Sequence, residues 1–218
     1  MPGPIFIPDD FSGYAIDSLC IPKRFMRDLD HVLIPQGFIR DRTRRMAEEI
    51  SSEMGHTPFT ALCVLKGSYR FFCELLEEMK NYETKAITLE FLRMRSYIDT
   101  ESSGNVTVGR DVDLASFKGR NLLIVEDIVD TGTTMTKMLD VLNRPENRPA
   151  SIKVATLLWK RTSRSNGYAP DYAGFAIPDR FVVGCGFDYN ELFRNLNHVC
   201  VLNPDAIERY SLVQNGVL

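Results

Sequence analysis

A turn rich in carboxylates and hydroxyls, within residues 122–135, has the residue types best suited to chemistry in this sequence. The segment reads LLIVEDIVDTGTTM, so an apolar run ends at Glu126 and Asp127, and Asp130 and Gly132 follow. The segment predicts a phosphate site, because it combines hydroxyls, free backbone N–H groups and the N-terminus of a following helix. The helix N-terminus carries the equivalent of about half a positive elementary charge. Glycine lets the backbone approach a phosphate closely. The hydroxyls belong to Thr131, Thr133 and Thr134.

The adjacent carboxylates of Glu126 and Asp127 suit a ribose or a divalent cation. As acceptors they match vicinal hydroxyls, and their oxygens match the ligands that a hard cation prefers. For any one of these residues alone, the better interpretation is a strand end or a helix cap. The whole pattern in this order favours a site for a sugar phosphate.

Apolar periodicity predicts the elements that must position this turn. Continuous apolar runs predict strands, and apolar spacings of three or four predict helices. The predicted strands are 59–65, 85–97, 122–125 and 152–159, and the predicted helices are 41–54, 71–79 and 131–142. This alternation predicts an α/β fold, in which helices cover both faces of a parallel sheet and ligands gather at the carboxyl ends of the strands.

The two ends of the chain do not continue the alternation. We expect a single domain over residues 1–218, with a core at about 40–170 and a small hood formed by about 1–40 and 171–218. The polar segment 99–110 predicts a mobile loop that continues into a weak hairpin and is suited to act as a lid.

Composition favours a small-molecule partner. The chain has 26 basic and 29 acidic residues, a net charge of -3 and no long basic run, so we expect no nucleic-acid partner. No stretch of about 18 apolar residues and no leader pattern appear, which predicts no membrane association and a cytoplasmic location. Five cysteines without a CxxC pair indicate reduced thiols. Three histidines without ligand spacing argue against a histidine zinc site.

The acidic segment resembles the phosphoribosyl pyrophosphate (PRPP) motif of type I phosphoribosyltransferases. Over about 14–201, the segments LCVLKGSYRF, RMRSY, LWKRTSRS, IPDRFVVG and FDYNELFRNLNHVCV extend the resemblance to the hypoxanthine-guanine phosphoribosyltransferase family. The resemblance implies the type I phosphoribosyltransferase fold and a homodimer or homotetramer. It implies a purine salvage enzyme that uses Mg²⁺ to transfer the 5-phosphoribosyl group from PRPP to N9 of hypoxanthine or guanine. The products are IMP or GMP and pyrophosphate.

By resemblance, Asp130 is the catalytic base or acceptor beside N7 of the purine. The ribose and 5-phosphate positions are Glu126, Asp127, Asp130, Thr131, Gly132, Thr133 and Thr134, and the pyrophosphate positions are Lys66, Gly67 and Arg194. The purine positions are Lys160, Phe181, Val182 and Asp188; the metal positions are Glu126, Asp127 and Asp188; the lid positions are Ser96 and Tyr97. In the family the peptide that corresponds to Leu65–Lys66 is often cis.

Two departures from the family pattern stand out. Ser68 occupies a position where relatives often carry glycine, and Thr133 one where several carry a basic residue. Alternative interpretations remain for four of these residues. Lys66 could be a solvated surface lysine and Phe181 a core aromatic residue. Asp188 could cap a turn, and Arg194 could form a surface ion pair. A regulatory nucleotide-binding protein of the same fold with weak catalysis, or a xanthine-preferring enzyme, remain alternative functions.

Overall fold

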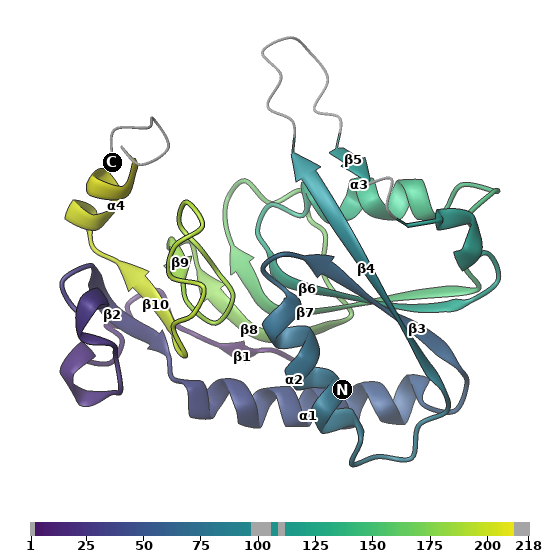
Figure 1. The fold of residues 1–218 in the computed structure, drawn as a ribbon, viewed down its shortest axis with the longest axis horizontal. Helices are drawn as coiled ribbons and strands as arrows, with labels where there is room; N and C mark the ends of the chain where they lie inside the picture. The colour runs from purple at the N-terminus through teal and green to yellow at the C-terminus, as the bar shows by residue number, and fades with distance from the viewer. Residues whose placement is uncertain (1–2, 97–105, 109–111, 212–218) are drawn as a thin grey trace, which may run out of the picture.

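The computed structural model describes residues 3–96, 106–108 and 112–211 and is built around a seven-stranded sheet (Figure 1). The strand order is β1-β8-β7-β6-β3-β4-β5, and every neighbouring pair is parallel except β4 and β5. The strands are β1 (Ile5–Phe6), β3 (Phe59–Leu65), β4 (Ile87–Ser96), β5 (Val106–Val108), β6 (Asn121–Val129), β7 (Ser151–Arg161) and β8 (Tyr172–Pro178). The predicted α/β fold with a parallel sheet is confirmed.

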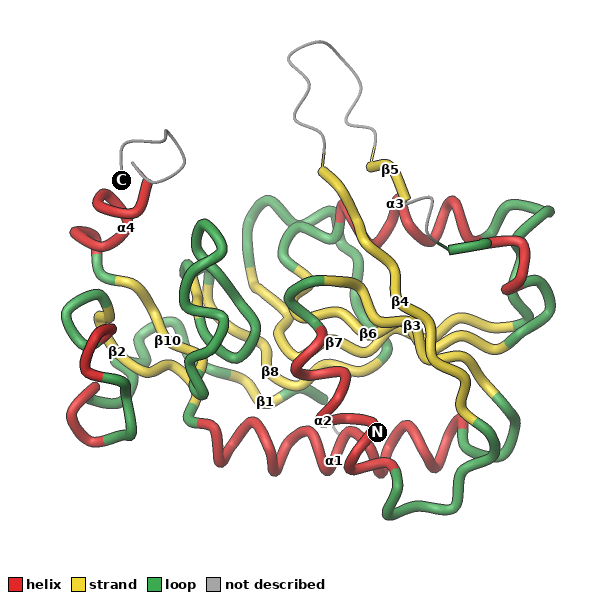
Figure 2. Tube along the Cα trace, viewed as in Figure 1, coloured by secondary structure: helices red, strands yellow, loops and turns green. Residues whose placement is uncertain are grey.

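Helices cover both faces of this sheet (Figure 2). The helices α1 (Gln36–Met54) and α2 (Tyr69–Met79) pack on one face, and α3 (Thr133–Leu142) packs on the other. Along β3, Ala61 and Cys63 join the core under α1 and α2, whereas Leu62 and Val64 join the core under α3. Successive side chains of a strand point to opposite faces, so this continuous apolar run serves two cores.

A second, three-stranded antiparallel sheet forms the hood. Its order is β2-β10-β9, from β2 (Leu29–Ile34), β9 (Val182–Val183) and β10 (Val199–Leu202), and α4 (Pro204–Ser211) follows β10. Short 3₁₀ turns lie at η1 (Ile16–Ser18), η2 (Lys23–Phe25) and η3 (Leu114–Phe117). A small hood built from both ends of the chain was predicted, and it lies at the left of Figure 1.

Several predicted boundaries need correction. The strands β1 and β8 fall in segments that we assigned to the hood, yet both pair in the main sheet. The guanidinium of Arg161 stabilises the β1–β8 edge of the sheet, because it donates hydrogen bonds to the carbonyls of Ala176 at 2.7 Å and Ile7 at 2.8 Å. Helix α1 begins at Gln36, directly after Pro35, rather than at residue 41. Strand β6 continues to Val129, beyond its apolar run.

The predicted hairpin after β4 is present, since β5 pairs antiparallel with β4. Tyr97 and most of the 99–110 segment lie outside the described residues. Within the described ranges, no helix has the length and apolarity needed to cross a membrane.

Candidate functional site

The acidic turn lies where β6 ends and α3 begins, at the carboxyl edge of the parallel sheet. Glu126 is still in register with Thr156 of β7, so the backbone that carries its carboxylate is held within the sheet. A hollow of about 210 Å³ opens here. Its lining residues are Glu126, Ile128, Val129, Asp130, Thr131, Gly132, Thr134 and Met135. The structure therefore brings most of the residues of the predicted sugar phosphate turn around one cavity.

Backbone geometry at Gly132 sets the shape of this turn. Gly132 has φ of 82°, a left-handed conformation that favours glycine, and a Cβ there would lie 2.3 Å from Asn166 Oδ1. The Thr131 hydroxyl accepts a hydrogen bond from the Thr133 N–H at 3.3 Å and donates to the Thr133 hydroxyl at 3.1 Å. Asn166 holds the turn from outside, because its N–H donates to the Thr131 carbonyl at 2.9 Å.

The carboxylates of Glu126 and Asp127 are half-buried side by side. Burial raises the pKa of Glu126 well above its ordinary value, and the charge of Asp127 adds to the shift. Burial also raises the pKa of Asp127, although hydrogen bonds, including one from the Ile128 N–H at 2.8 Å, oppose the shift. This pair is poorly solvated in the free protein and suits a cation that would replace the missing solvation.

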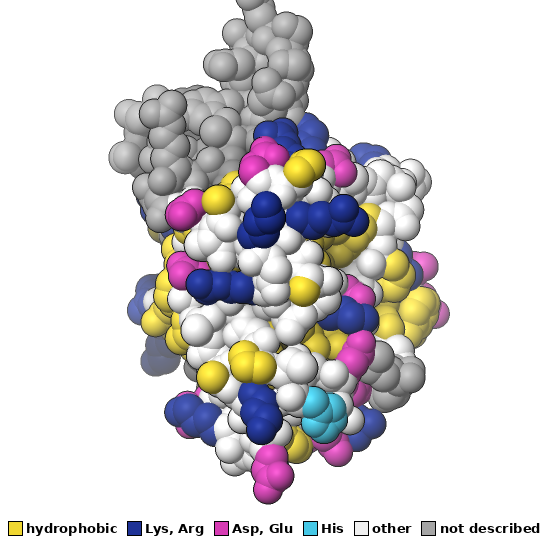
Figure 3. Space-filling model, turned by 90° about the vertical axis from the view of Figure 1, so that its right-hand side faces the viewer, with side chains coloured by type: hydrophobic (Ala, Val, Ile, Leu, Met, Phe, Trp, Pro, Cys, Tyr) yellow, Lys and Arg dark blue, Asp and Glu magenta, His cyan; other side chains and the backbone are white. Residues whose placement is uncertain are grey.

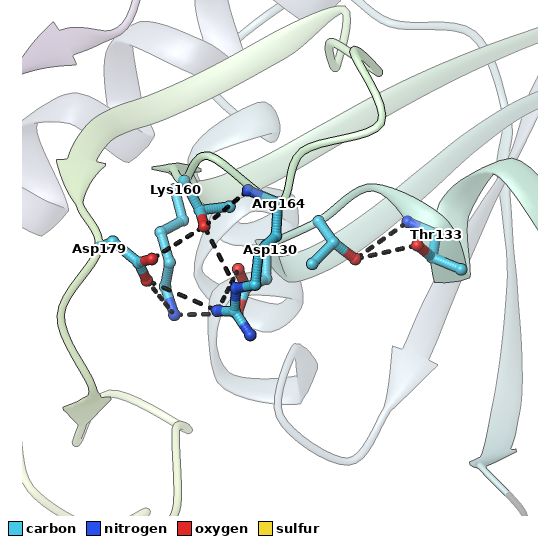
Figure 4. Close-up of polar contacts among 7 residues, drawn as sticks. Asp130, Thr133, Lys160, Arg164 and Asp179 are labelled. Carbon is cyan, nitrogen blue, oxygen red and sulfur yellow. Dashed lines mark hydrogen bonds and ion pairs between the residues drawn. The ribbon is translucent and has the colours of Figure 1, made fainter.

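A cluster of two cations and two carboxylates lies next to the hollow (Figure 4). Lys160, at the end of β7, has a side chain that is only 9% exposed, and its ammonium donates to Asp130 Oδ2 at 2.9 Å. Asp179 Oδ1 lies 3.9 Å from the same ammonium. Arg164 reaches both carboxylates, at 3.9 Å from Asp130 Oδ1 and 3.7 Å from Asp179 Oδ1. Asp130 Oδ1 is buried and accepts no hydrogen bond from the described residues.

The loop after β3 faces the acidic pair. The Leu65–Lys66 peptide is cis, as the resemblance implied. A Cβ on Gly67 would lie 1.6 Å from Asp127 Oδ2, so the backbone passes directly against this carboxylate. The ammonium of Lys66 pairs with Glu191 Oε2 at 2.9 Å. The Ser68 hydroxyl is turned away from the site, because it donates to the Val64 carbonyl.

The loop at 184–194, between β9 and β10, supplies the remaining charged groups. Arg194 pairs with Asp188 Oδ1 at 2.7 Å and with Glu191 Oε1 at 3.4 Å, and its Nη1 donates to the Gly186 carbonyl at 2.8 Å. A Cβ on Gly186 would lie 2.3 Å from the Gly67 carbonyl oxygen, so the two loops are in backbone contact.

The three predicted metal positions do not form one protein-only set. Across residues 3–96, 106–108 and 112–211, no group of three or more His, Cys, Asp or Glu side chains is arranged to hold a metal. Asp188 is instead paired with Arg194. Mg²⁺ commonly takes one or two carboxylates together with substrate oxygens and water, and Glu126 with Asp127 fits that pattern.

The other predicted positions lie in the hood and beside it. Phe181 is 45% exposed and packs edge-on against Tyr189, with ring centroids 5.1 Å apart. Val182 is buried in β9 opposite Val201. Ser96 ends β4, and Tyr97 lies outside the described residues.

Three polar residues contribute to this region without having been predicted as site residues. They are Asp179, Asn166 and Glu191, which contact Lys160, the Thr131 turn and Lys66 respectively. Asp179 follows β8, at the same sheet edge as Lys160, but this strand was not predicted and so did not mark Asp179. Asn166 and Glu191 lie in loops, where no apolar period marks them.

A second hollow among the described residues is lined by no carboxylate. A hollow of about 390 Å³ at the amino ends of β3 and β6 has Arg120 as its only charged lining residue. On the face shown in Figure 3, Lys and Arg side chains are interspersed with Asp and Glu. The acidic turn therefore remains the strongest candidate site.

Comparison with known proteins agrees with this geometry. The family model described as phosphoribosyl transferase domain matches residues 36–190. The hypoxanthine-guanine phosphoribosyltransferases of Canis lupus familiaris and Homo sapiens are each 47% identical over 211 residues, covering 94% of this chain and 96% of theirs. A crystal structure of the Schistosoma mansoni enzyme in complex with IMP is 34% identical, with a TM-score of 0.78, covering 95% of this chain and 99% of that one. The chain therefore belongs to the phosphoribosyltransferase family, and within it to the hypoxanthine-guanine phosphoribosyltransferases.

Proposed function

We propose that this chain is a purine salvage enzyme that transfers the 5-phosphoribosyl group of PRPP to N9 of hypoxanthine or guanine. The products are IMP or GMP and pyrophosphate. The single observation that carries the proposal is the Asp130–Lys160 pair beside the threonine turn. This pair supports the proposal because a carboxylate acceptor and an ammonium donor, both suited to a purine, lie next to a turn suited to a phosphate.

The purine enters between Asp130 and Lys160, which are paired in the free protein at 2.9 Å. The ammonium of Lys160 is a donor only, so it favours the O6 carbonyl of hypoxanthine or guanine over the amino group of adenine. Asp130 accepts the proton of the purine, and its unsatisfied Oδ1 supports this role. When Asp130 binds the purine instead of Lys160, the carboxylate of Asp179 still lies beside the Lys160 ammonium and balances its charge. Phe181 stacks on the ring, and the backbone of Val182 bonds its edge.

The phosphoribosyl group lies over the acidic turn. Thr131, Gly132, Thr133 and Thr134 bind the 5-phosphate, while Glu126 and Asp127 accept hydrogen bonds from the ribose hydroxyls. Their negative charge also favours the cationic sugar that develops as the C1–oxygen bond breaks. The C1–N9 bond then forms, and the proton of the purine passes to Asp130.

Pyrophosphate leaves toward Lys66, Gly67 and Arg194. Lys66 is paired with Glu191, and Arg194 is paired with Asp188. Both cations therefore lie at this loop, where they would exchange their carboxylate partners for pyrophosphate. Glu126 and Asp127 would hold Mg²⁺, and Asp188 would join them only by giving up its pairing with Arg194; the ion would supply positive charge to the leaving group.

The remaining assignments rest on the resemblance and on composition. Ser96 and Tyr97 belong to a lid that excludes water during transfer. The chain forms one domain with its hood, and it assembles as a homodimer or homotetramer. A cytoplasmic location is consistent with its five unpaired cysteines.

An assay of product formation tests the proposal. The protein is incubated with PRPP and Mg²⁺ and with hypoxanthine, guanine, xanthine or adenine, and the nucleotides are separated. We expect IMP and GMP and no AMP. XMP as the dominant product would indicate a xanthine-preferring enzyme. Binding of PRPP without any nucleotide formation would indicate a regulatory protein.

A further inference from the structure

We propose that α4 is a positioning element for the loop 188–194, acting through Asn190 and Tyr189. The inference rests on the proposed function, because this loop carries Asp188 and Arg194, the groups assigned there to the metal and to pyrophosphate. Figure 1 shows α4 at the end of the hood, following β10.

The loop is closed by backbone hydrogen bonds between Tyr189 and Leu192, at 3.0 Å and 3.2 Å, and by one from the Glu191 N–H to Asp188 Oδ2 at 2.8 Å, yet parts of its backbone are in an unfavourable conformation. Asn190, Glu191 and Phe193 have φ values of 51°, 66° and 72°, a left-handed region that side chains other than glycine, and to a lesser degree asparagine, disfavour. Such a conformation persists only where neighbouring structure stabilises it. Glu191 contacts Lys66 in this conformation, so the backbone shape matters to the charged groups of the site.

Contacts from α4 add to these internal bonds. The Asn190 side-chain amide donates to the Tyr210 carbonyl at 2.7 Å, and the Tyr189 hydroxyl donates to the Ile207 carbonyl at 3.1 Å. The rings of Phe193 and Tyr210 pack edge to face, with centroids 5.2 Å apart. Tyr210 lies among the last four residues of α4, whose carbonyls have no partner within the helix, so its carbonyl is free to accept the bond from Asn190.

The helix is itself anchored to the hood. Asp28, which is fully buried, accepts hydrogen bonds from Arg209 and, at 3.0 Å, from the Tyr210 hydroxyl. The N–H of Asn203 donates to the Asp28 carbonyl at 3.0 Å. A chain of contacts therefore runs from Asp28, directly before β2, through α4 to the loop. On its site side, Tyr189 also packs against Phe181.

The variant Asn190→Gly tests the hydrogen bond from the Asn190 side chain to α4 without adding backbone strain at residue 190. Glycine adopts the left-handed conformation readily, so the variant removes the bond to Tyr210 without adding steric cost at residue 190. Asn81→Gly is the matched control, because Asn81 also loses one side-chain hydrogen bond, to Glu78, at an exposed position remote from the loop. A loop that samples its binding conformation less often lowers apparent affinity in proportion.

Two measurements on the full-length chain test the proposal. Amide hydrogen exchange at residues 191–194 should become faster in Asn190→Gly and stay unchanged in Asn81→Gly. The KM for PRPP in IMP synthesis should rise roughly tenfold in Asn190→Gly, with kcat within about twofold of the parent.

Unchanged exchange overturns the inference, and so does faster exchange without a rise in KM, since the bond would then be structural only. A fall in kcat at constant KM also overturns it. If the parent chain makes no IMP, the proposed function fails, while the exchange rates still decide whether α4 holds the loop.

Discussion

Replacing Gly67 with alanine measures how closely the loop after β3 must approach the acidic pair. The new Cβ would lie 1.6 Å from Asp127 Oδ2, whereas real contacts of this kind do not fall below 3.0 Å. The carboxylate or the loop must therefore move by about 1.4 Å. A misplacement of about 1 Å in an active site can cost on the order of 100-fold in rate. We expect kcat/KM for PRPP to fall about 100-fold, or about 2.7 kcal/mol.

Steady-state synthesis of IMP at varied PRPP is the assay. Gly37→Ala is the matched control, because a Cβ at Gly37 meets nothing within 4 Å. Both variants should melt within a few degrees of the parent. In an Asp127→Ala background the Gly67→Ala change should cost little more, because the clashing carboxylate is gone. Full additivity of the two changes, or activity of Gly67→Ala within threefold of the parent, would refute the reasoning.

Three further predictions concern single side chains. Asp130→Asn should lower kcat roughly a hundredfold with little change in melting temperature; near-normal turnover would rule out its role as acceptor. Arg42→Met should destabilise the fold by about 3 kcal/mol in urea denaturation, because Arg42 is buried and binds Glu49 and two carbonyls of β8; a loss below about 1 kcal/mol would contradict this. Burial, with a smaller contribution from Arg70, lowers the pKa of His198, whose Nδ1 accepts the Gln36 N–H at the start of α1. The folded state thus favours neutral His198, so this part of the stability is present above about pH 6.5 and declines as pH falls. The urea midpoint should drop more between pH 7 and pH 5 in the parent than in His198→Asn, which keeps an acceptor; equal drops would refute the assignment.

Local patterns in the sequence predicted the central elements well. The apolar run 59–65 matches β3 residue for residue, because a strand buried on both faces must be apolar throughout. Strand β8 is equally apolar and was missed as part of the main sheet. Its neighbours in that sheet are β1, more than 160 residues away, and β7, and no local period encodes such pairing.

In the site too, contiguous residues could be predicted from the sequence, whereas contacts between distant residues could not. The segment 122–135 could be recognised from the sequence because its carboxylates, glycine and hydroxyls lie close together along the chain. The Asp130–Lys160 contact joins two residues separated by 30 positions, and only the resemblance brought both residues into one site. Asn190 had no signal, since a residue in the left-handed region follows neither the helical nor the strand period, and its contact with Tyr210 of α4 joins segments 20 positions apart.

The contact between Gly67 and Gly186 links the loop after β3 to the loop between β9 and β10. The Gly67 carbonyl oxygen lies 2.3 Å from the position of a Cβ on Gly186, so neither backbone has room to move toward the other. A ligand that pushes residues 65–67 toward residue 186 must therefore displace the second loop as well.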